Sequence, residues 1–168
     1  RGIIGDNLHP EIALRQGMAF GSFVGKGPVI VGGDTRVSHD MVKFAVISGL
    51  LSVGTDVIDI GEVTTPTVQH RILHHNAKGG MVITASHNPV QWNGIKLMNQ
   101  QGAFLVQDQF DAFVDLYTKN NFTLADWKTI GKYSKDDSAL ETHVSRILAK
   151  IDTSAIKAAN LSVLIDAN

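Results

Sequence analysis

A serine in a turn directly after an apolar segment is the residue of this chain best suited to covalent chemistry. Residues 84–89 read Thr-Ala-Ser-His-Asn-Pro and follow the apolar run Met-Val-Ile at 81–83. Such a run is typical of a buried strand, and the Asn-Pro pair ends it in a turn and disfavours helical backbone at Asn88. We therefore expect the hydroxyl of Ser86 to be exposed on a loop at the end of a strand.

Titratable and basic side chains accompany this serine. His87 is its neighbour, and Lys96 ends the run Asn-Gly-Ile-Lys at 93–96, which opens another apolar stretch. A phosphorylated serine would need such a cation, because phosphoserine carries close to two negative charges and three strong acceptor oxygens. His87 could hydrogen-bond a phosphoryl oxygen or transfer a proton, since its charge changes near neutral pH. Simpler alternatives stay open: His87 could stabilise the loop, and Lys96 could be an edge-strand lysine that discourages aggregation.

The elements that must position these residues alternate between helical and strand patterns. In chain order the patterns predict helix 11–24, strand 29–31, helix 38–54 capped by Ser38, strand 57–60, helix 65–76 and strand 81–84. This order predicts an α/β fold, a mostly parallel sheet with helices on both faces and ligands beyond the carboxyl ends of the strands. Segment 95–98 returns after a loop too short for a helical crossover, so we expect it to pair antiparallel at or near an edge.

The second half of the chain carries weaker signals. Apolar spacing predicts a helix over 106–117, and a capping-box pattern opens a helix over 138–148. Residues 118–137 show little periodicity, which predicts a solvated linker without chemistry. His70 and His74 have the spacing of a metal-binding pair on a helix but lack an evident third ligand, so we predict that they, with His75, lie on the surface.

Length and composition exclude several classes of protein. The 168 residues, 43% of them hydrophobic, suffice for one main domain with a core. A net charge of -1 gives no overall field for nucleic acid or an anionic membrane. The chain has no cysteine, which excludes disulfides and thiol chemistry and suits the cytoplasm. No apolar run is long enough for a bilayer span, and no signal peptide is evident.

Further motifs occur in a fixed order around the serine loop. Arg-Gly stands at 1–2, Gly-Asp-Thr-Arg-Val-Ser at 33–38 and Thr-Thr-Pro-Thr at 64–67, ahead of the serine motif at 84–89 and Asn-Gly-Ile-Lys at 93–96. Together they resemble the first domain of the α-D-phosphohexomutase superfamily, which contains phosphoglucomutase, phosphomannomutase and phosphoglucosamine mutase. The resemblance covers essentially the whole chain.

The resemblance implies a three-layer α/β/α first domain over residues 1–160, and a first strand of a second domain over 161–168. It implies interconversion of hexose 1-phosphate and hexose 6-phosphate, of glucose, mannose or glucosamine, through a phosphoserine and a hexose bisphosphate. Ser86 would be the nucleophile and phosphoryl carrier, with Lys96 and Arg1 as cations. Mg²⁺ would bind through the phosphoryl group on Ser86, the other ligands coming from an Asp-x-Asp-x-Asp loop of the second domain; this sequence contains no such triplet.

The resemblance also implies that three residues of the motifs bind phosphate: Arg36, Asn88 and Asn93. Arg36 could instead be structural and fix the turn at Asp34. The partners implied are the hexose phosphate, the bisphosphate and the remaining domains, so this chain alone is expected to be inactive. One alternative is a non-catalytic module that binds phosphosugars or another domain. A serine hydrolase is disfavoured, because no Gly-x-Ser-x-Gly elbow surrounds Ser86 and no acid-histidine pair can be singled out.

Overall fold

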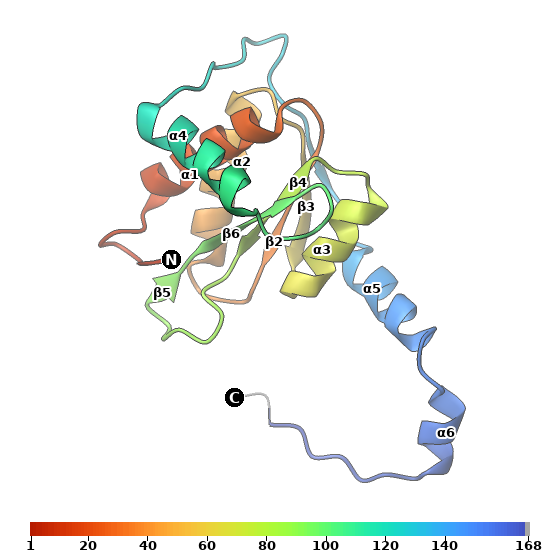
Figure 1. Ribbon diagram of the computed structural model, residues 1–168. Coiled ribbons are helices and arrows are strands. Elements are labelled where there is room, and N and C mark those ends of the chain that lie inside the picture. The colour runs from red at the N-terminus through yellow and green to blue at the C-terminus, as the bar shows by residue number, and fades with distance from the viewer. Residues whose placement is uncertain (167–168) are drawn as a thin grey trace.

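A computed structural model describes residues 1–166 and contains a mixed sheet of five strands (Figure 1). In sheet order the strands are β6 (Ile95–Asn99), β4 (Gly79–Ile83), β2 (Val29–Gly33), β3 (Val57–Glu62) and β7 (Tyr133–Lys135). Neighbours are parallel except β6, which pairs antiparallel with β4 at the edge. The predicted α/β class, the mixed and mostly parallel sheet and the antiparallel edge strand are confirmed.

Helices cover both faces of the sheet, which gives the predicted α/β/α layers (Figure 1). One face carries α1 (Pro10–Val24), α2 (His39–Ser52) and α4 (Gln107–Lys119). The other carries α3 (Thr65–His74) and the start of α5 (Ala139–Leu148).

The core is divided in two by the sheet because successive strand residues point to opposite faces. In β2, Val29 and Val31 pack into the cluster under α1 and α2, whereas Ile30 packs into the cluster under α3. All three are fully buried. A continuous apolar strand is therefore what a sheet covered on both faces requires.

Close packing of α1 on α2 depends on two glycines. A Cβ on Gly17 would collide with the carbonyl oxygen of Val46, and a Cβ on Gly49 would collide with that of Leu14. The two helix backbones thus approach each other where neither carries a side chain. This contact fixes α2, and with it the turn that precedes α2 at the carboxyl end of β2.

The structure corrects the prediction that residues 118–137 form a solvated linker. Within that segment β7 pairs parallel with β3, and the Tyr133 hydroxyl donates a 3.0 Å hydrogen bond to Asp59 Oδ2. Burial is the main cause that raises the pKa of Tyr133 to about 12, and Asp59 adds to it. The strand was missed because its three residues, Tyr-Ser-Lys, are exposed and lack an apolar pattern.

Two predicted serine caps are also wrong in their details. Ser38 and Ser138 stand at the N-caps of α2 and α5, but neither side chain makes a capping hydrogen bond. The Ser38 hydroxyl accepts from Asn93 instead, and the Ser138 hydroxyl donates to Asp136. Ser38 therefore ties the start of α2 to a distant segment, whereas Ser138 bonds within the turn that precedes α5.

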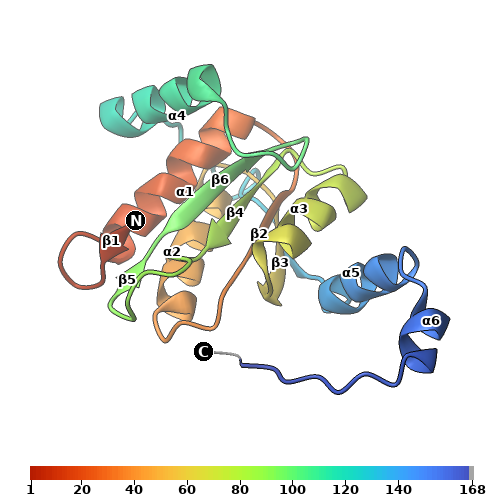
Figure 2. The ribbon, with the colours of Figure 1, turned by 60° about the horizontal axis from the view of Figure 1, so that its bottom comes forward.

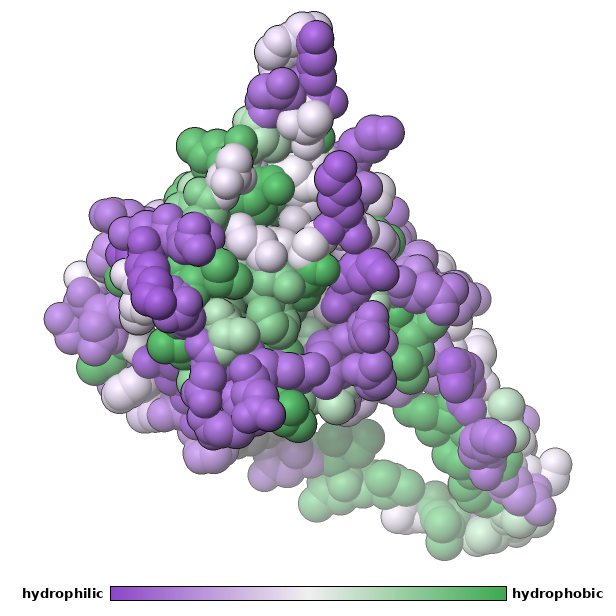
Figure 3. Space-filling view, turned by 45° about the horizontal axis from the view of Figure 1, so that its top comes forward, coloured by the Kyte–Doolittle hydropathy of each residue, from purple (hydrophilic) through white to green (hydrophobic). Residues whose placement is uncertain are grey.

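Beyond α5 the chain leaves the body of the domain as an arm (Figure 1). A helix that the sequence patterns did not predict, α6 (Thr153–Ala158), begins where the Asp152 carboxylate accepts from the Ala155 N–H. Residues 161–166 form no strand, and 167–168 of the predicted segment lie outside the described residues. Hydrophobic side chains are exposed along the arm (Figure 3). Within residues 1–166 no helix combines the length and apolarity needed to cross a membrane.

Candidate active site

Ser86 lies on a loop just beyond the carboxyl end of β4, with its side chain exposed. Its backbone φ is 58°, in the left-handed region that residues other than glycine seldom adopt. The Ser86 N–H donates a 2.9 Å hydrogen bond to the Thr84 hydroxyl, and the Thr84 N–H donates to the Gly94 carbonyl at 2.9 Å. Thr84 was not singled out from the sequence, although its place two residues before the serine allows this turn. The expected exposure of Ser86 is found.

Arg36 holds the backbone of the serine loop. Its guanidinium donates to the carbonyl oxygens of Ser86 (3.0 Å), Asn88 (2.7 Å), Pro89 (2.9 Å) and Trp92 (3.0 Å). Its Nε lies 3.3 Å from the Asp34 carboxylate. Because four carbonyls and one carboxylate occupy this guanidinium, its contacts are those of a residue that positions the loop.

Asn93 anchors the far end of the loop and is fully buried. Its amide donates a 2.8 Å hydrogen bond to the Ser38 hydroxyl, and its side-chain oxygen accepts from the Gly94 N–H at 2.8 Å. These contacts satisfy the side chain inside the protein. The structure therefore places Asn93 beneath the loop, away from its exposed side.

Arg1 reaches the serine loop through a short ribbon. Strand β1 (Gly2–Ile3) pairs antiparallel with β5 (Trp92–Asn93), so the N-terminus lies beside the loop (Figure 2). Arg1 Nη1 donates a 2.9 Å hydrogen bond to Asn88 Oδ1. The structure thus brings together two predicted site residues from the first motif and the serine motif.

Lys96 lies on the edge strand β6, opposite Val82 of β4. Its ammonium lies 5.8 Å from the centre of the Phe104 ring. Lys96 and Arg1 both line a hollow of about 390 Å³ beside α1 and α4. The two cations therefore line the same cavity. Within residues 1–166, Lys96 makes no hydrogen bond to Ser86.

His87 is exposed next to Ser86, and its Nδ1 lies 3.4 Å from the Ser86 hydroxyl oxygen. That separation is longer than a strong hydrogen bond to a hydroxyl. In the described part of the chain no carboxylate hydrogen-bonds His87. The arrangement therefore lacks the acid that orients the histidine of a hydrolase triad.

His39, which the sequence did not single out, lies next to Ser38 at the start of α2. The ring is almost completely buried, and neither nitrogen has a partner among the described residues. Burial is the main cause that lowers the pKa of His39, and Lys43 adds to it. A neutral imidazole thus packs close to Gly33, under the same edge of the sheet as Ser86.

Comparison with known proteins accounts for this loop and the fold around it. Residues 1–124 match the family model described as phosphoglucomutase/phosphomannomutase, alpha/beta/alpha domain I. The chain belongs to this family. The resemblance read from the motifs is confirmed, and the relatives that match carry the names of mutases.

Individual relatives of this phosphoglucomutase/phosphomannomutase domain are longer than the chain. A phosphoglucomutase/phosphomannomutase of Thermococcus kodakarensis is 43% identical over 99% of this chain and 37% of the relative. A phosphoglucosamine/phosphogalactosamine mutase of Sulfurisphaera tokodaii is 38% identical over the same shares, 99% and 37%. A crystal structure of a family protein from Burkholderia thailandensis has a TM-score of 0.77 at 31% identity, covering 89% of this chain and 34% of that one. The chain thus spans about 37% of the first relative's length.

The metal expected from the family resemblance does not fit the described residues alone. Among residues 1–166 no three histidine, aspartate or glutamate side chains converge as a metal site. Asp34, whose carboxylate lies beside the residue that holds the serine loop, is already paired with the Arg36 guanidinium. Ser86 itself offers one oxygen, which is fewer than the ligands Mg²⁺ needs.

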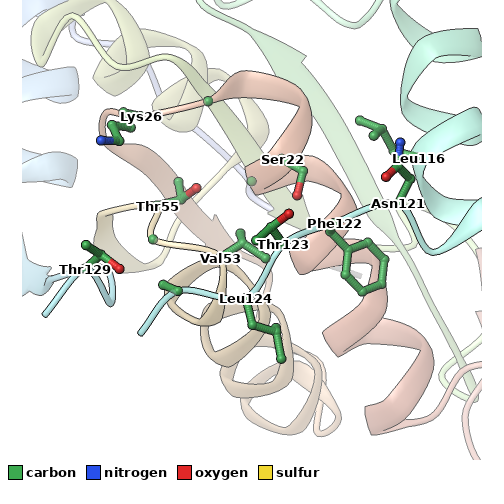
Figure 4. A pocket seen from close by; sticks show the side chains of 14 residues that line it. Ser22, Lys26, Val53, Thr55, Leu116, Asn121, Phe122, Thr123, Leu124 and Thr129 are labelled. Carbon is green, nitrogen blue, oxygen red and sulfur yellow. The ribbon is translucent and has the colours of Figure 1, made fainter. Parts of the chain in front are cut away.

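A hollow of about 500 Å³ lies away from the serine loop. Its walls come from the carboxyl ends of α1 and α2 and from residues 121–125, with Thr55 and Phe122 among the side chains shown in Figure 4. The ends of α1 and α2 precede β2 and β3, and residues 121–125 precede β7, whereas Ser86 follows β4. Because these strands are parallel, the hollow lies at their amino ends and the serine lies at their carboxyl ends.

Proposed function

We propose that this chain is the phosphoserine-bearing domain of a phosphohexomutase. The whole protein would interconvert hexose 1-phosphate and hexose 6-phosphate through a hexose bisphosphate, with glucose, mannose or glucosamine as the sugar, in the cytoplasm. The observation that carries the proposal is the exposed Ser86 hydroxyl on a loop whose backbone Arg36 holds at four carbonyls. Family membership and the relatives named as mutases support it.

The chemistry is a phosphoryl transfer between two oxygens. In the charging step the Ser86 oxygen bonds to phosphorus, the bond from phosphorus to the sugar oxygen breaks, and the serine proton passes to that oxygen. We assign the relay of this proton to His87, whose Nδ1 lies 3.4 Å from the serine oxygen. In the discharging step the same bonds change in reverse, toward the other hydroxyl of the sugar. Such transfers depend mainly on positioning and on neutralising charge.

The neutralising groups we assign are Arg1 and Lys96, which share one hollow. Arg1 already touches the serine loop through Asn88, and we assign its guanidinium to a phosphoryl group on Ser86. Lys96 would leave the Phe104 ring, a contact worth about 1 kcal/mol at an exposed site. Arg36 acts as a positioning residue, and Asn93 anchors the loop.

We also propose that Mg²⁺ binds one oxygen of a phosphoryl group on Ser86. The remaining ligands would lie in the part of the longer relatives that this chain does not span. When bound, the ion would neutralise phosphoryl charge.

Intact-mass measurement after incubation with glucose, mannose or glucosamine 1,6-bisphosphate tests the assignment. We expect one added phosphoryl group, peptide mapping to Ser86 and no addition in Ser86→Ala. Ser145→Ala, which removes an exposed serine of α5, is the matched control. This variant should still gain one phosphoryl group on Ser86. Absence of the adduct would favour the non-catalytic module, and labelling of Ser86 by a fluorophosphonate would favour the hydrolase.

A further inference from the structure

A basic hollow lies between α3 and α5, on the face of the sheet that α3 covers. Its volume is about 380 Å³, and its lining consists of His70, His143, Arg146, Ile147, Lys150 and Ile151. No acidic residue is among them, and none of them belongs to the serine loop. The described chain thus gathers four basic side chains around one cavity at a place that the proposed mutase chemistry does not use.

The base of this cavity holds an unusual pair of basic groups. Arg146 Nη1 lies 2.6 Å from Nε2 of His70, whose side chain is only 9% exposed. A guanidinium can only donate, so Nε2 accepts and the proton of the neutral ring is on Nδ1. That Nδ1 is buried and has no partner in residues 1–166. Both groups therefore have donor capacity that no protein acceptor satisfies.

The neighbours of His70 leave the cluster without a compensating charge. Burial is the main cause that lowers the pKa of His70, and each charged neighbour that contributes is basic and lowers it further. The carboxylate of Asp136, which lies between β7 and α5, is already bound by Arg71, His75 and Ser138. The charged or titratable groups around the ring are Arg71 and His74 from α3, His143 and Arg146 from α5, and Lys150 beyond α5.

We propose that this α3–α5 pocket is a binding site for an oxyanion of the phosphate class. Arg146, His143 and Lys150 would contact the anion, with His70 at the base of the site. Arg146 supplies a planar fork of donors that matches such oxygens. His143 is held by its Nδ1, 2.8 Å from the Thr67 hydroxyl, which leaves Nε2 for the ligand. Its ring stacks on that of His70 at 5.8 Å, which fixes the two imidazoles together.

Binding would change the protonation of His70. An anion that accepts from Arg146 withdraws the guanidinium from Nε2, and a protonated His70 can then donate to the same anion. The ring takes up a proton when the anion binds, so the affinity rises as the pH falls through the ordinary range of histidine. The pocket would thus couple anion binding to proton uptake independently of Ser86.

The test is an NMR titration of the histidine ring signals of the 168-residue chain with sodium phosphate at constant ionic strength. We expect saturable shifts of the His70 and His143 signals, with an affinity for the phosphate dianion about fivefold tighter at about pH 6 than at about pH 7.5. Arg146→Gln should weaken binding at least about tenfold. Its side chain is exposed, so the variant should keep the fold. Lys26→Gln, which removes an exposed lysine elsewhere, is the matched control.

His87 reports separately on the serine loop. Phosphate that shifts His87 but not His70 or His143 would overturn the pocket and leave the proposed function intact. Equal shifts in wild type and Arg146→Gln, or shifts that rise linearly without saturation, would show nonspecific screening and also overturn it. If Arg146→Gln disturbs folding, Lys150→Gln must weaken phosphate binding for the proposal to stand.

Discussion

The guanidinium of Arg36 donates a 3.0 Å hydrogen bond to the backbone carbonyl of Ser86, fifty residues away in the sequence. Together with three further carbonyls of the same loop, this contact ties the turn after β2 to the loop after β4. The two strands are parallel neighbours, so both turns meet at one edge of the sheet. The conformation of the loop that carries Ser86 therefore depends on a side chain from a different motif.

Arg36→Lys should disrupt the serine loop, because an ammonium cannot replace donors spread over a planar fork. We expect a loss of about 2–3 kcal/mol in the free energy of unfolding, and a large decrease in the rate of Ser86 phosphorylation. Urea unfolding and intact-mass kinetics measure the two effects. Arg15→Lys is the control, since Arg15 also donates to a carbonyl, that of Tyr117, but away from the site. An unchanged rate of Ser86 phosphorylation in Arg36→Lys would contradict the positioning role of Arg36.

The left-handed backbone of Ser86 predicts an inverted order of stability. Ser86→Gly should be more stable than Ser86→Ala by about 1 kcal/mol, because glycine adopts a φ of 58° without steric cost. At Ser145, within α5, alanine should instead be more stable than glycine by about 1 kcal/mol. Urea unfolding of the four variants gives the comparison. Equal stabilities of the two Ser86 variants would contradict the loop conformation.

Lys96→Met should slow phosphoryl transfer to Ser86 by about 10- to 100-fold while changing sugar binding little, since its charge matters most during transfer. The rate of mass increase with hexose bisphosphate is the measurement. Lys135→Met provides a matched control, because Lys135 lies on β7, the opposite edge strand of the same sheet. If both variants react at the wild-type rate, Lys96 is an edge-strand lysine.

Turnover is expected to need more than this chain. We predict no conversion of glucose 1-phosphate by the 168-residue chain with Mg²⁺ and bisphosphate, because residues 1–166 hold no convergent set of metal ligands. Without the remaining contacts, the bisphosphate would not be held for its second transfer. A coupled assay of glucose 1-phosphate conversion, with Ser86→Ala as the control, is the measurement. Turnover that depends on Ser86 would show that one domain suffices.

The sequence patterns correctly predicted structural features that depend only on adjacent residues. The apolar run 29–31 and the turn at Ser86 identified a buried strand and an exposed hydroxyl, since both depend on adjacent residues. The role of Arg36 in the loop could not be derived in this way, because its acceptors are backbone carbonyls that carry no sequence signal. Of the two roles considered for Arg36, fixing the turn at Asp34 is closer to the observed contacts than binding phosphate.

The histidines of α3 show the same limit. His70 was predicted to lie on the surface, but its side chain is buried under α5, where it contacts Arg146. Helical spacing placed it on a face of α3 without showing that a segment from the far end of the chain covers that face. Likewise β7 was missed, because parallel pairing with β3 is a tertiary interaction.

Asp136 gives the chain an acid-sensitive contact between α3 and the segment before α5. Burial alone would raise the pKa of this carboxyl, but hydrogen bonds from His75, Ser138 and the buried Arg71 outweigh it and hold the pKa well below its usual range. A depressed pKa stabilises the fold fully above the ordinary value of about 4, and the contribution is lost as the pH falls further.

Asp136→Asn should therefore cost about 3 kcal/mol at neutral pH, because it leaves the buried Arg71 without its ionic partner. It should also flatten the decline in unfolding free energy between about pH 5 and pH 2, since the carboxyl that titrates in the wild type is gone. Urea unfolding across this range measures both effects. Asp115→Asn removes an exposed carboxylate paired with Lys119 and should leave the wild-type pH profile nearly unchanged. A profile for Asp136→Asn as steep as that of the wild type would assign the acid sensitivity to other carboxyls.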